Sequence, residues 1–343
     1  MSLQVPQIQQ PQRQQGEPLV RRMSLGDVSL DDGERVELSL NRYIINVIVL
    51  YGLGMAVELL PYLVGPFERG FFCDDETIQY SYKGSTVNVT ALYFFAMCVP
   101  LFSILWAEFV VQARIEKRKR RYHLRNRNVH SLVVHFFQEF GYVQLGLISV
   151  LSLMQVTKFV VGRLRPHFLT VCKIENLSEL CKTDHTFVNI GEYTCTGAKT
   201  DVHEARLSFF SGHSAISVYT AFYAILYLQA KLGRFEPTKI FVSLVQTILL
   251  CAALVICYTR ITDNWHHWSD VLVGIIVGIL VAIWTALFWA RLFERTAHFR
   301  VSLLPFFEKQ DRNLGHTPAT ASTNDINSQG GGGDQASIDQ QHL

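Results

Sequence analysis

Residues 268–290 read WSDVLVGIIVGILVAIWTALFWA, and this stretch decides the class of fold. Apart from Asp270 it carries no charge, and it is rich in Val, Ile, Leu and Trp. About 20 consecutive apolar residues in a helix cross the hydrocarbon core of a bilayer. The stretch is long enough for that, so it predicts a transmembrane helix.

Five further apolar segments of similar length precede it along the chain: residues 43–63, 91–112, 132–157, 213–230 and 240–258. Hydrophobic residues make up 49% of the 343 residues and charged residues only 17%, a low charged fraction for a soluble protein. The sequence therefore predicts an all-α, polytopic integral membrane protein, with six transmembrane helices within residues 41–295.

The two ends of the chain have a different composition. Residues 1–40 are rich in Gln, and residues 296–343 are rich in Ser, Thr, Asn, Gln and Gly. Both segments have too few apolar side chains to fold, so they are predicted to be disordered tails.

Basic residues crowd the loop between the second and third segments: Arg114, Lys117, Arg118, Lys119, Arg120, Arg121, Arg125 and Arg127. Beside transmembrane segments, such a cluster marks the cytosolic side far more often than it binds nucleic acid. With six segments, both tails are then expected in the cytosol, and no nucleic-acid partner is expected. The loop 158–212, on the opposite side, also holds basic residues and goes against this rule, although Lys158 and Arg165 have a chemical reason to be there.

The loops on the other side carry marks of an extracellular or luminal location. Asn88-Val-Thr and Asn176-Leu-Ser are sequons for N-glycosylation, and both fall in these loops. Four of the seven cysteines lie in the same loops: Cys73, Cys172, Cys181 and Cys195. In an oxidising compartment they predict at least one disulfide. The pairing stays open, although the spacing allows Cys172–Cys181.

The first of three polar motifs lies at the end of the third segment and runs from Lys158 to Pro166. Lys158 and Arg165 are seven residues apart, so on a helix both project from one face, and Pro166 then ends the helix. The alternative is that the two cations only anchor a helix end at the membrane surface.

The second motif, Ser211-Gly212-His213, opens the fourth segment. Ser is a good helix N-cap, Gly allows a ligand to approach the backbone, and the free N–H groups of a first helical turn bind anions. A capped helix with an incidental His213 is the alternative.

The third motif contains Arg260, His266 and Asp270, just before and at the start of the sixth segment. The four-residue spacing from His266 lets the Asp270 carboxylate accept a proton from one ring nitrogen, which leaves the other nitrogen free. His267 is rotated by about 100° on a helix and is expected to point elsewhere. Asp270 could instead serve only as a favourable charge at a helix N-terminus.

Taken together, the motifs supply three cations, two imidazoles and a carboxylate at helix ends on one side of the membrane. That set suits transfer of a phosphoryl group through a histidine. The sequence has no carboxylate cluster placed to bind magnesium. We therefore expect neither a metal nor another cofactor.

At these residues the chain resembles the type 2 phosphatidic acid phosphatase superfamily and, more closely, the lipid phosphate phosphatases. The superfamily pattern is Lys-x6-Arg-Pro, Pro-Ser-Gly-His and Ser-Arg-x5-His-x3-Asp. In this chain Phe210 replaces the Pro, as in the animal branch, and Thr259 replaces the Ser while keeping the hydroxyl. The loop 69–75 is also similar to the animal branch, and the resemblance covers about residues 40–295.

The resemblance implies a role for each motif residue. His266 is the nucleophile that forms a phosphohistidine, His213 is the general acid and base, and Asp270 orients His266. The remaining residues hold the phosphate oxygens: Lys158, Arg165, Ser211, Gly212 and Arg260. The implied activity is metal-independent hydrolysis of phosphatidate, lysophosphatidate, sphingosine-1-phosphate and ceramide-1-phosphate at the extracytoplasmic face. The plasma membrane is the first expectation for its location, and an internal membrane is the second.

Other functions remain open at this point. A non-catalytic membrane scaffold of the same fold is expected to lose motif residues, and none of the key polar residues is missing here. A transporter is expected to carry polar residues within its spans, as His135 and Glu139 do, but we interpret these two as interior hydrogen-bonding groups. A phosphotransferase uses similar histidines, but the loop 69–75 argues against it. The expected partners are lipid phosphates and the membrane, with self-association into a homo-oligomer left open.

Overall fold

The computed structural model describes residues 35–114, 121–124, 127–183, 185–233 and 238–293. Apart from Phe293, these residues belong to one unit of the chain, Met1–Leu292. Most of the two predicted tails, and most of the basic cluster between the second and third segments, lie outside the described residues.

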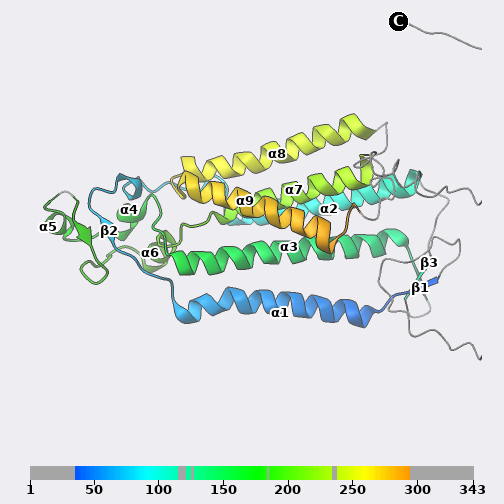
Figure 1. Ribbon diagram of the computed structural model, residues 1–343, viewed down its shortest axis with the longest axis horizontal. Helices are drawn as coiled ribbons and strands as arrows, with labels where there is room; N and C mark the ends of the chain where they lie inside the picture. Colours follow the sequence, from blue (N-terminus) through cyan, green and yellow to red (C-terminus); the bar gives the residue numbers. More distant parts are fainter. Residues whose placement is uncertain (1–34, 115–120, 125–126, 184, 234–237, 294–343) are drawn as a thin grey trace, which may run out of the picture. The chain divides into compact units, whose positions relative to one another are not determined.

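Six long helices form a bundle (Figure 1): α1 (Leu40–Val64), α2 (Val89–Arg114), α3 (Ser131–Val161), α7 (Gly212–Leu232), α8 (Lys239–Thr262) and α9 (Trp268–Trp284), which continues as the π-helical turn η3 (Thr285–Trp289). Among the described residues, six helices are long and apolar enough to cross a membrane. Large apolar side chains such as Ile48, Leu53 and Phe102 are exposed on them, as expected for surfaces that face lipid. The predicted six-helix membrane protein is therefore confirmed.

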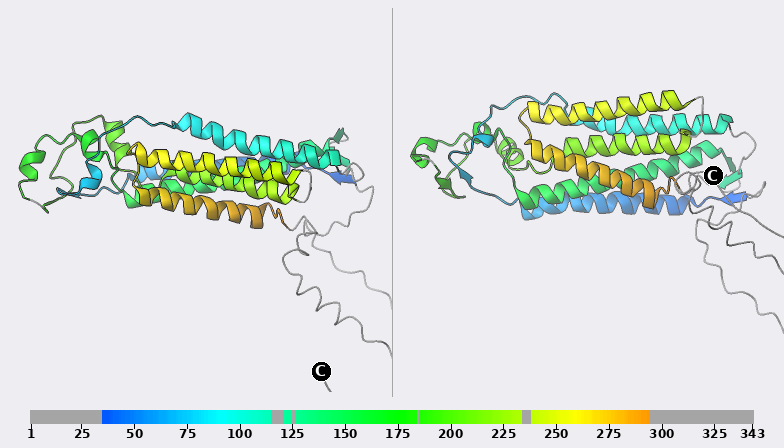
Figure 2. Two further views of the ribbon diagram at one scale, coloured as in Figure 1. Left: turned by 90° about the horizontal axis from the view of Figure 1, so that it is seen from above. Right: turned by 45° about the horizontal axis from the view of Figure 1, so that its top comes forward.

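Helix α7 lies inside the bundle and packs against α2, α3, α8 and α9. Helix α1 packs at the edge, beside α3 (Figures 1 and 2). Two glycines of α9 allow the closest approach to α7. A Cβ atom on Gly274 would lie 2.6 Å from the Ser211 carbonyl oxygen, and one on Gly278 would lie 2.7 Å from the Ala215 oxygen. Such small residues let helix backbones approach in membranes, and here they place the start of α7 against α9.

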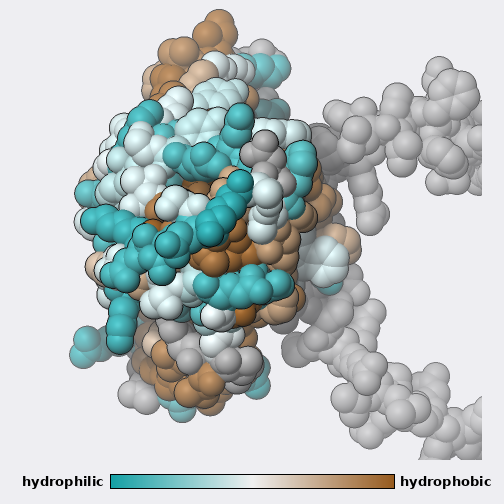
Figure 3. All heavy atoms as spheres, turned by 90° about the vertical axis from the view of Figure 1, so that its left-hand side faces the viewer, coloured by the Kyte–Doolittle hydropathy of each residue, from teal (hydrophilic) through white to brown (hydrophobic). Residues whose placement is uncertain are grey.

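The loops at one end of the bundle form a small folded cap, and we call this end the disulfide end. Its elements are β2 (Phe71–Phe72), the 3₁₀ turn η1 (Glu76–Ile78), α4 (Phe168–Cys172), α5 (Leu177–Leu180), β5 (Phe187–Val188) and α6 (Lys199–Ala205). Strands β2 and β5 pair antiparallel, with Phe71 opposite Val188. Phe71, Phe168 and Val188 are buried in the apolar core of this cap. Figure 3 views this end, where hydrophilic residues cover much of the surface around a smaller hydrophobic area.

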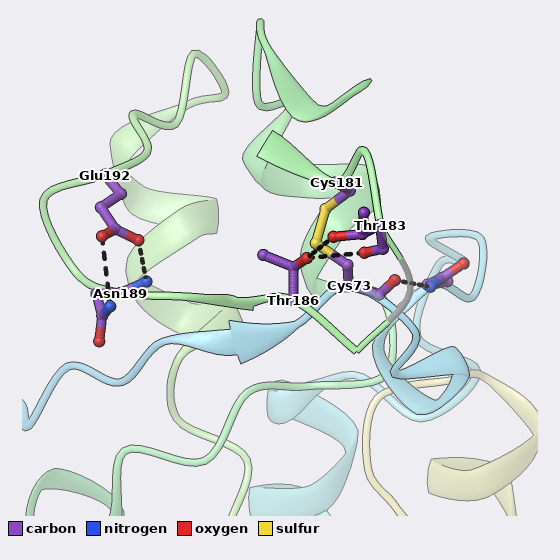
Figure 4. The surroundings of a disulfide bond; sticks show 7 residues. Cys73, Cys181, Thr183, Thr186, Asn189 and Glu192 are labelled. Atoms are coloured by element: carbon purple, nitrogen blue, oxygen red, sulfur yellow. Dashed lines mark hydrogen bonds between the residues drawn. A yellow bond between two sulfur atoms is a disulfide. The ribbon is translucent and has the colours of Figure 1, made fainter. Parts of the chain in front are cut away.

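Two disulfides hold the cap together. Cys73 pairs with Cys181, joining the loop after α1 to the loop after α4, and Figure 4 shows their surroundings. Cys172 pairs with Cys195. The prediction of at least one disulfide among these four cysteines is confirmed. The sequence left the pairing open. Cys172 does not pair with Cys181, as its spacing allowed, because α4 and the bridge between Ile174 and Cys195 bring Cys195 to Cys172 instead.

The opposite end of the bundle carries a small sheet with strand order β1-β3-β4. Its strands are β1 (Arg35–Glu37), β3 (Arg121–Leu124) and β4 (Arg127–Val129). β3 pairs in parallel with β1 and antiparallel with β4. β1 falls within residues 1–40, for which the sequence predicted no regular structure, so that prediction is wrong for this short strand.

Buried charges pair in the half of the bundle towards this opposite end. The Lys231 ammonium lies 2.8 Å from Glu108 and 3.6 Å from Glu139. The Tyr227 hydroxyl donates to Glu108 at 2.9 Å. Glu139 is fully buried and joins α3 to α7 through this pairing, in agreement with the interpretation of Glu139 as an interior group.

Candidate active site

The first motif spans the end of α3 and the chain that follows. Gly162 ends the helix in the left-handed region, with φ of 55°, and its N–H bonds to the Lys158 carbonyl. A Cβ atom at Gly162 would lie 1.8 Å from the Phe67 carbonyl oxygen, so only glycine fits. Lys158 therefore lies in the last turn of α3, but Arg165 lies beyond it. The predicted shared helix face, with Pro166 ending the helix, is wrong.

Arg165 is held at the site by contacts outside the helix. Its N–H donates to the Ala205 carbonyl at 2.8 Å, and its Nη2 lies 3.0 Å from the Glu204 carboxylate. The guanidinium stacks over the Trp265 ring, 4.8 Å from the ring centroid. The side chain is only 3% exposed, and Nε and Nη1 have no hydrogen-bond partner among the described residues. Buried donors without partners are costly, so these two groups suit an anionic ligand.

The second motif forms the start of α7, as predicted. Ser211 is the N-cap, and its hydroxyl oxygen accepts from the Ser214 N–H. Gly212 also has a packing role. A Cβ atom there would lie 2.2 Å from the Met154 sulfur, so the glycine leaves room for this α3 side chain. His213 Nε2 lies 3.1 Å from the Val87 carbonyl. Because a carbonyl can only accept, that nitrogen carries a proton.

Arg260 of the third motif lies in the last turn of α8 and is 1% exposed. Its Nη1 donates to Ser85 at 2.8 Å, and its Nη2 lies 3.2 Å from the Asp263 carboxylate. Nη2 also donates to the Thr259 hydroxyl at 3.1 Å. Thr259, which replaces the Ser of the superfamily pattern, thus uses its hydroxyl to contact Arg260. Asp263, three residues after Arg260, could have been found from helical spacing. Ser85 is distant from Arg260 in sequence, and no sequence pattern indicated their contact.

Asp270 is fully buried in the first turn of α9 and accepts several hydrogen bonds. Arg163 Nη1 lies 2.5 Å from one carboxylate oxygen, and the Ser208 hydroxyl donates to the other at 2.6 Å. That second oxygen also lies 3.2 Å from His267 Nδ1 and 3.9 Å from His266 Nδ1. Sequence reasoning missed Arg163 and Ser208, although each lies within three residues of a motif member.

Two predictions about this motif are wrong. Helix α9 begins at Trp268 with His267 as its N-cap, so His266 lies before the helix and helical spacing does not set its distance from Asp270. His267 does not point elsewhere, because its N–H and its ring both contact the Asp270 carboxylate.

His266 is 4% exposed and lies in the turn between α8 and α9. Burial, together with the nearby charges of Arg165 and Lys158, lowers the pKa of His266 to about 3, against the opposing effect of Asp270. The imidazole is therefore neutral at neutral pH and has one nitrogen with a free electron pair.

The three motifs meet at the disulfide end of the bundle. The charges of Lys158 and Arg165 act on both His213 and His266, and the charge of Arg260 acts on His213. Backbone hydrogen bonds join the motifs: Ser208 donates to Arg163 at 2.9 Å, and Ser211 donates to Asp270 at 3.1 Å. The structure thus brings every predicted catalytic and phosphate-binding residue to one site.

Other predicted features lie around this site. The sequon residues Asn88 and Asn176 are both exposed at the disulfide end. A pocket of about 360 Å³ is lined by Arg163 and His267, together with aromatic residues of the cap such as Phe71 and Phe187. In the part of the chain that the structure describes, no group of three or more His, Cys, Asp or Glu residues is placed to hold a metal ion.

Comparisons with known proteins agree with these motifs. A model of the PAP2 superfamily matches residues 140–294. A Caenorhabditis elegans protein named phospholipid phosphatase homolog 1.2 homolog is 44% identical over 241 residues, which cover 70% of this chain and 70% of that protein. Phospholipid phosphatase 2 of Mus musculus is 33% identical over 240 residues, which cover 67% of this chain and 80% of that protein. No solved structure matches the chain. The resemblance found in the motifs is confirmed, and this chain belongs to the PAP2 superfamily and, within it, to the phospholipid phosphatases, a family of membrane-bound lipid phosphatases.

Proposed function

We propose that this lipid phosphatase hydrolyses lipid phosphomonoesters through a phosphohistidine on His266. The substrate class comprises phosphatidate, lysophosphatidate, sphingosine-1-phosphate and ceramide-1-phosphate, which share a phosphomonoester at the membrane surface. The observation that carries the proposal is the buried Arg165 guanidinium, whose Nε and Nη1 donors have no partner among the described residues, close to the neutral imidazole of His266.

The proposed reaction has two steps. In the first, the free nitrogen of His266 attacks phosphorus while the bond to the lipid oxygen breaks. His213 enters this step as an imidazolium, with its Nε2–H on the Val87 carbonyl, and donates its Nδ1 proton to the departing alkoxide. In the second, His213 takes a proton from water, the water oxygen attacks phosphorus, and the bond to His266 breaks to release inorganic phosphate. Lys158, Arg165 and Arg260 stabilise the negative charge of the phosphoryl oxygens, as positioned donors do in many enzymes.

We further propose that the site faces the extracellular or luminal side, at the plasma membrane or an internal membrane. Exposed sequons and two disulfides lie at the same end of the bundle as the motifs, and both features arise in the secretory pathway. A lipid could keep its chains in the bilayer while its phosphate enters the site, which avoids about 0.8 kcal/mol of exposure per methylene.

The proposal is tested with two substrates that differ only in their leaving group. His213→Ala in purified protein should lose most hydrolysis of phosphatidate, because the lipid alkoxide needs a proton to depart. In the first turnover it should still release the leaving group of a nitrophenyl phosphate, which needs no proton, although the second step then lacks its base for either substrate. His266→Ala should release neither leaving group. Equal loss of first-turnover release from both substrates in His213→Ala would contradict its role as an acid.

A second arm addresses the metal. Three cations already neutralise the phosphoryl charge in the proposed site, so EDTA should leave hydrolysis of phosphatidate almost unchanged. Loss of activity in EDTA that added magnesium restores would show that a metal takes part in the reaction.

A further inference from the structure

The Asp270 carboxylate accepts its hydrogen bonds from groups other than His266. One oxygen accepts from Arg163. The other accepts from the Ser208 hydroxyl at 2.6 Å, the His267 N–H at 3.1 Å and His267 Nδ1 at 3.2 Å. All three donors are closer to this oxygen than the His266 ring nitrogen, which is 3.9 Å away, too far for a hydrogen bond.

Ser208 lies beside both groups. It is fully buried, and its hydroxyl oxygen lies 3.5 Å from His266 Nδ1. Its backbone N–H donates to the Arg163 carbonyl at 2.9 Å, which fixes the residue beside the first motif. Ser208 is therefore anchored on one side by the chain around Arg163 and on the other by the Asp270 carboxylate.

The proton count of this serine decides what it can do for His266. A hydroxyl has one hydrogen and two acceptor lone pairs. The hydrogen is directed to Asp270 at 2.6 Å, so towards His266 Nδ1 the oxygen can only accept. His266 must then carry its proton on Nδ1, and its Nε2 has a free electron pair. That is the form of histidine which attacks phosphorus.

We infer that Ser208 is a positioning residue that fixes the ring orientation and the reactive tautomer of His266, and that Asp270 acts on His266 through Ser208. The inference rests on the proposed function of His266 as the nucleophile. At 3.5 Å the contact between Ser208 and His266 is long, and such contacts often shorten in the substrate complex. Asp270 thereby anchors Ser208, Arg163 and His267 at the same time.

Ser208→Ala tests this inference directly, with Ser217→Ala as the matched control. Ser217 is also fully buried, and its hydroxyl bonds to the Ser214 carbonyl within α7. Ser208→Ala should lower kcat by about 100-fold with little change in KM, because phosphate binding does not involve the hydroxyl. Ser217→Ala should keep wild-type kcat, and melting temperatures of both variants show that each is folded.

Two further readouts separate positioning from a merely structural role. Ser208→Ala should lose the same factor on lipid and nitrophenyl substrates, because it impairs the attacking group and not the acid. In ¹⁵N-histidine NMR, the wild-type His266 signal should report a proton on Nδ1, and Ser208→Ala should show a mixture of tautomers. Unchanged kcat and an unchanged tautomer in folded Ser208→Ala would overturn the inference.

This result is distinguishable from failure of the proposed function. One outcome is that wild-type protein forms a phosphohistidine on His266 and that Ser208→Ala forms it equally fast. That result would support His266 as the nucleophile and refute the positioning role of Ser208. If wild-type protein forms no phosphohistidine, the proposed function itself fails.

Discussion

At the residue scale, burial keeps two imidazoles neutral, those of His266 and His167. His167 is an example outside the predicted motif residues. It is 2% exposed, its Nδ1 donates to the Asn264 carbonyl at 2.7 Å, and its ring packs edge-on against Trp265. Burial is the main reason that the pKa of His167 is lowered to about 4, with a further contribution from Arg165. His167 thus joins the chain after the first motif to the turn before His266.

The lowered pKa of His167 predicts acid sensitivity. The pKa of His167 in the folded protein lies below the unfolded value of 6.5. Above pH 6.5 the imidazole is therefore neutral in both states, and its protonation does not change the free energy of unfolding. As pH falls from about 6.5 to about 4, the unfolded chain takes up the proton first, and the free energy of unfolding should fall by about 3 kcal/mol from this residue. Below about pH 4 its contribution levels off.

Thermal unfolding in detergent from pH 7 to pH 4 checks this expectation. His167→Gln should show a smaller fall in melting temperature over that range than wild type. A slope in His167→Gln equal to that of wild type would contradict the account of this residue.

At the scale of elements, the pairing of Lys231 with Glu108 and Glu139 ties α7 to α2 and α3. Lys231→Met would leave two buried carboxylates without their cation. Removing one partner of a buried ion pair costs about 3–5 kcal/mol, so the melting temperature should fall strongly. Lys199→Met, at an exposed site in α6, should leave it unchanged. An equal melting temperature for Lys231→Met and wild type would refute this assignment of the pair.

Some of these elements could be predicted from the sequence, and others could not. The six membrane helices were predictable, because apolar runs of that length have few other uses. The Ser211 cap was predictable from local chemistry. The end of α3 was not, because Gly162 is required by a contact with Phe67, which is far away in sequence. For the same reason the roles of Arg163 and Ser208, and the contact of His267 with Asp270, needed the fold to become visible.

At the scale of the whole molecule, the position of the motifs predicts the side from which substrate arrives. All of them lie at the disulfide end, with the exposed Asn88 and Asn176. Intact cells carrying the protein at the surface should hydrolyse lipid phosphates added outside, and a glycosidase should remove glycans from Asn176. Activity confined to lipid supplied from the cytosol, or Asn176 labelled only from the cytosol, would invert the proposed topology.

The central claim is that the phosphoryl group passes through His266. Rapid alkaline quenching of wild-type protein with phosphate-labelled phosphatidate, followed by peptide mapping, measures this most directly. The account predicts label on His266 early in the reaction, its loss as inorganic phosphate appears, and none in His266→Ala. Label on another residue, or turnover at the wild-type rate by His266→Ala, would contradict it.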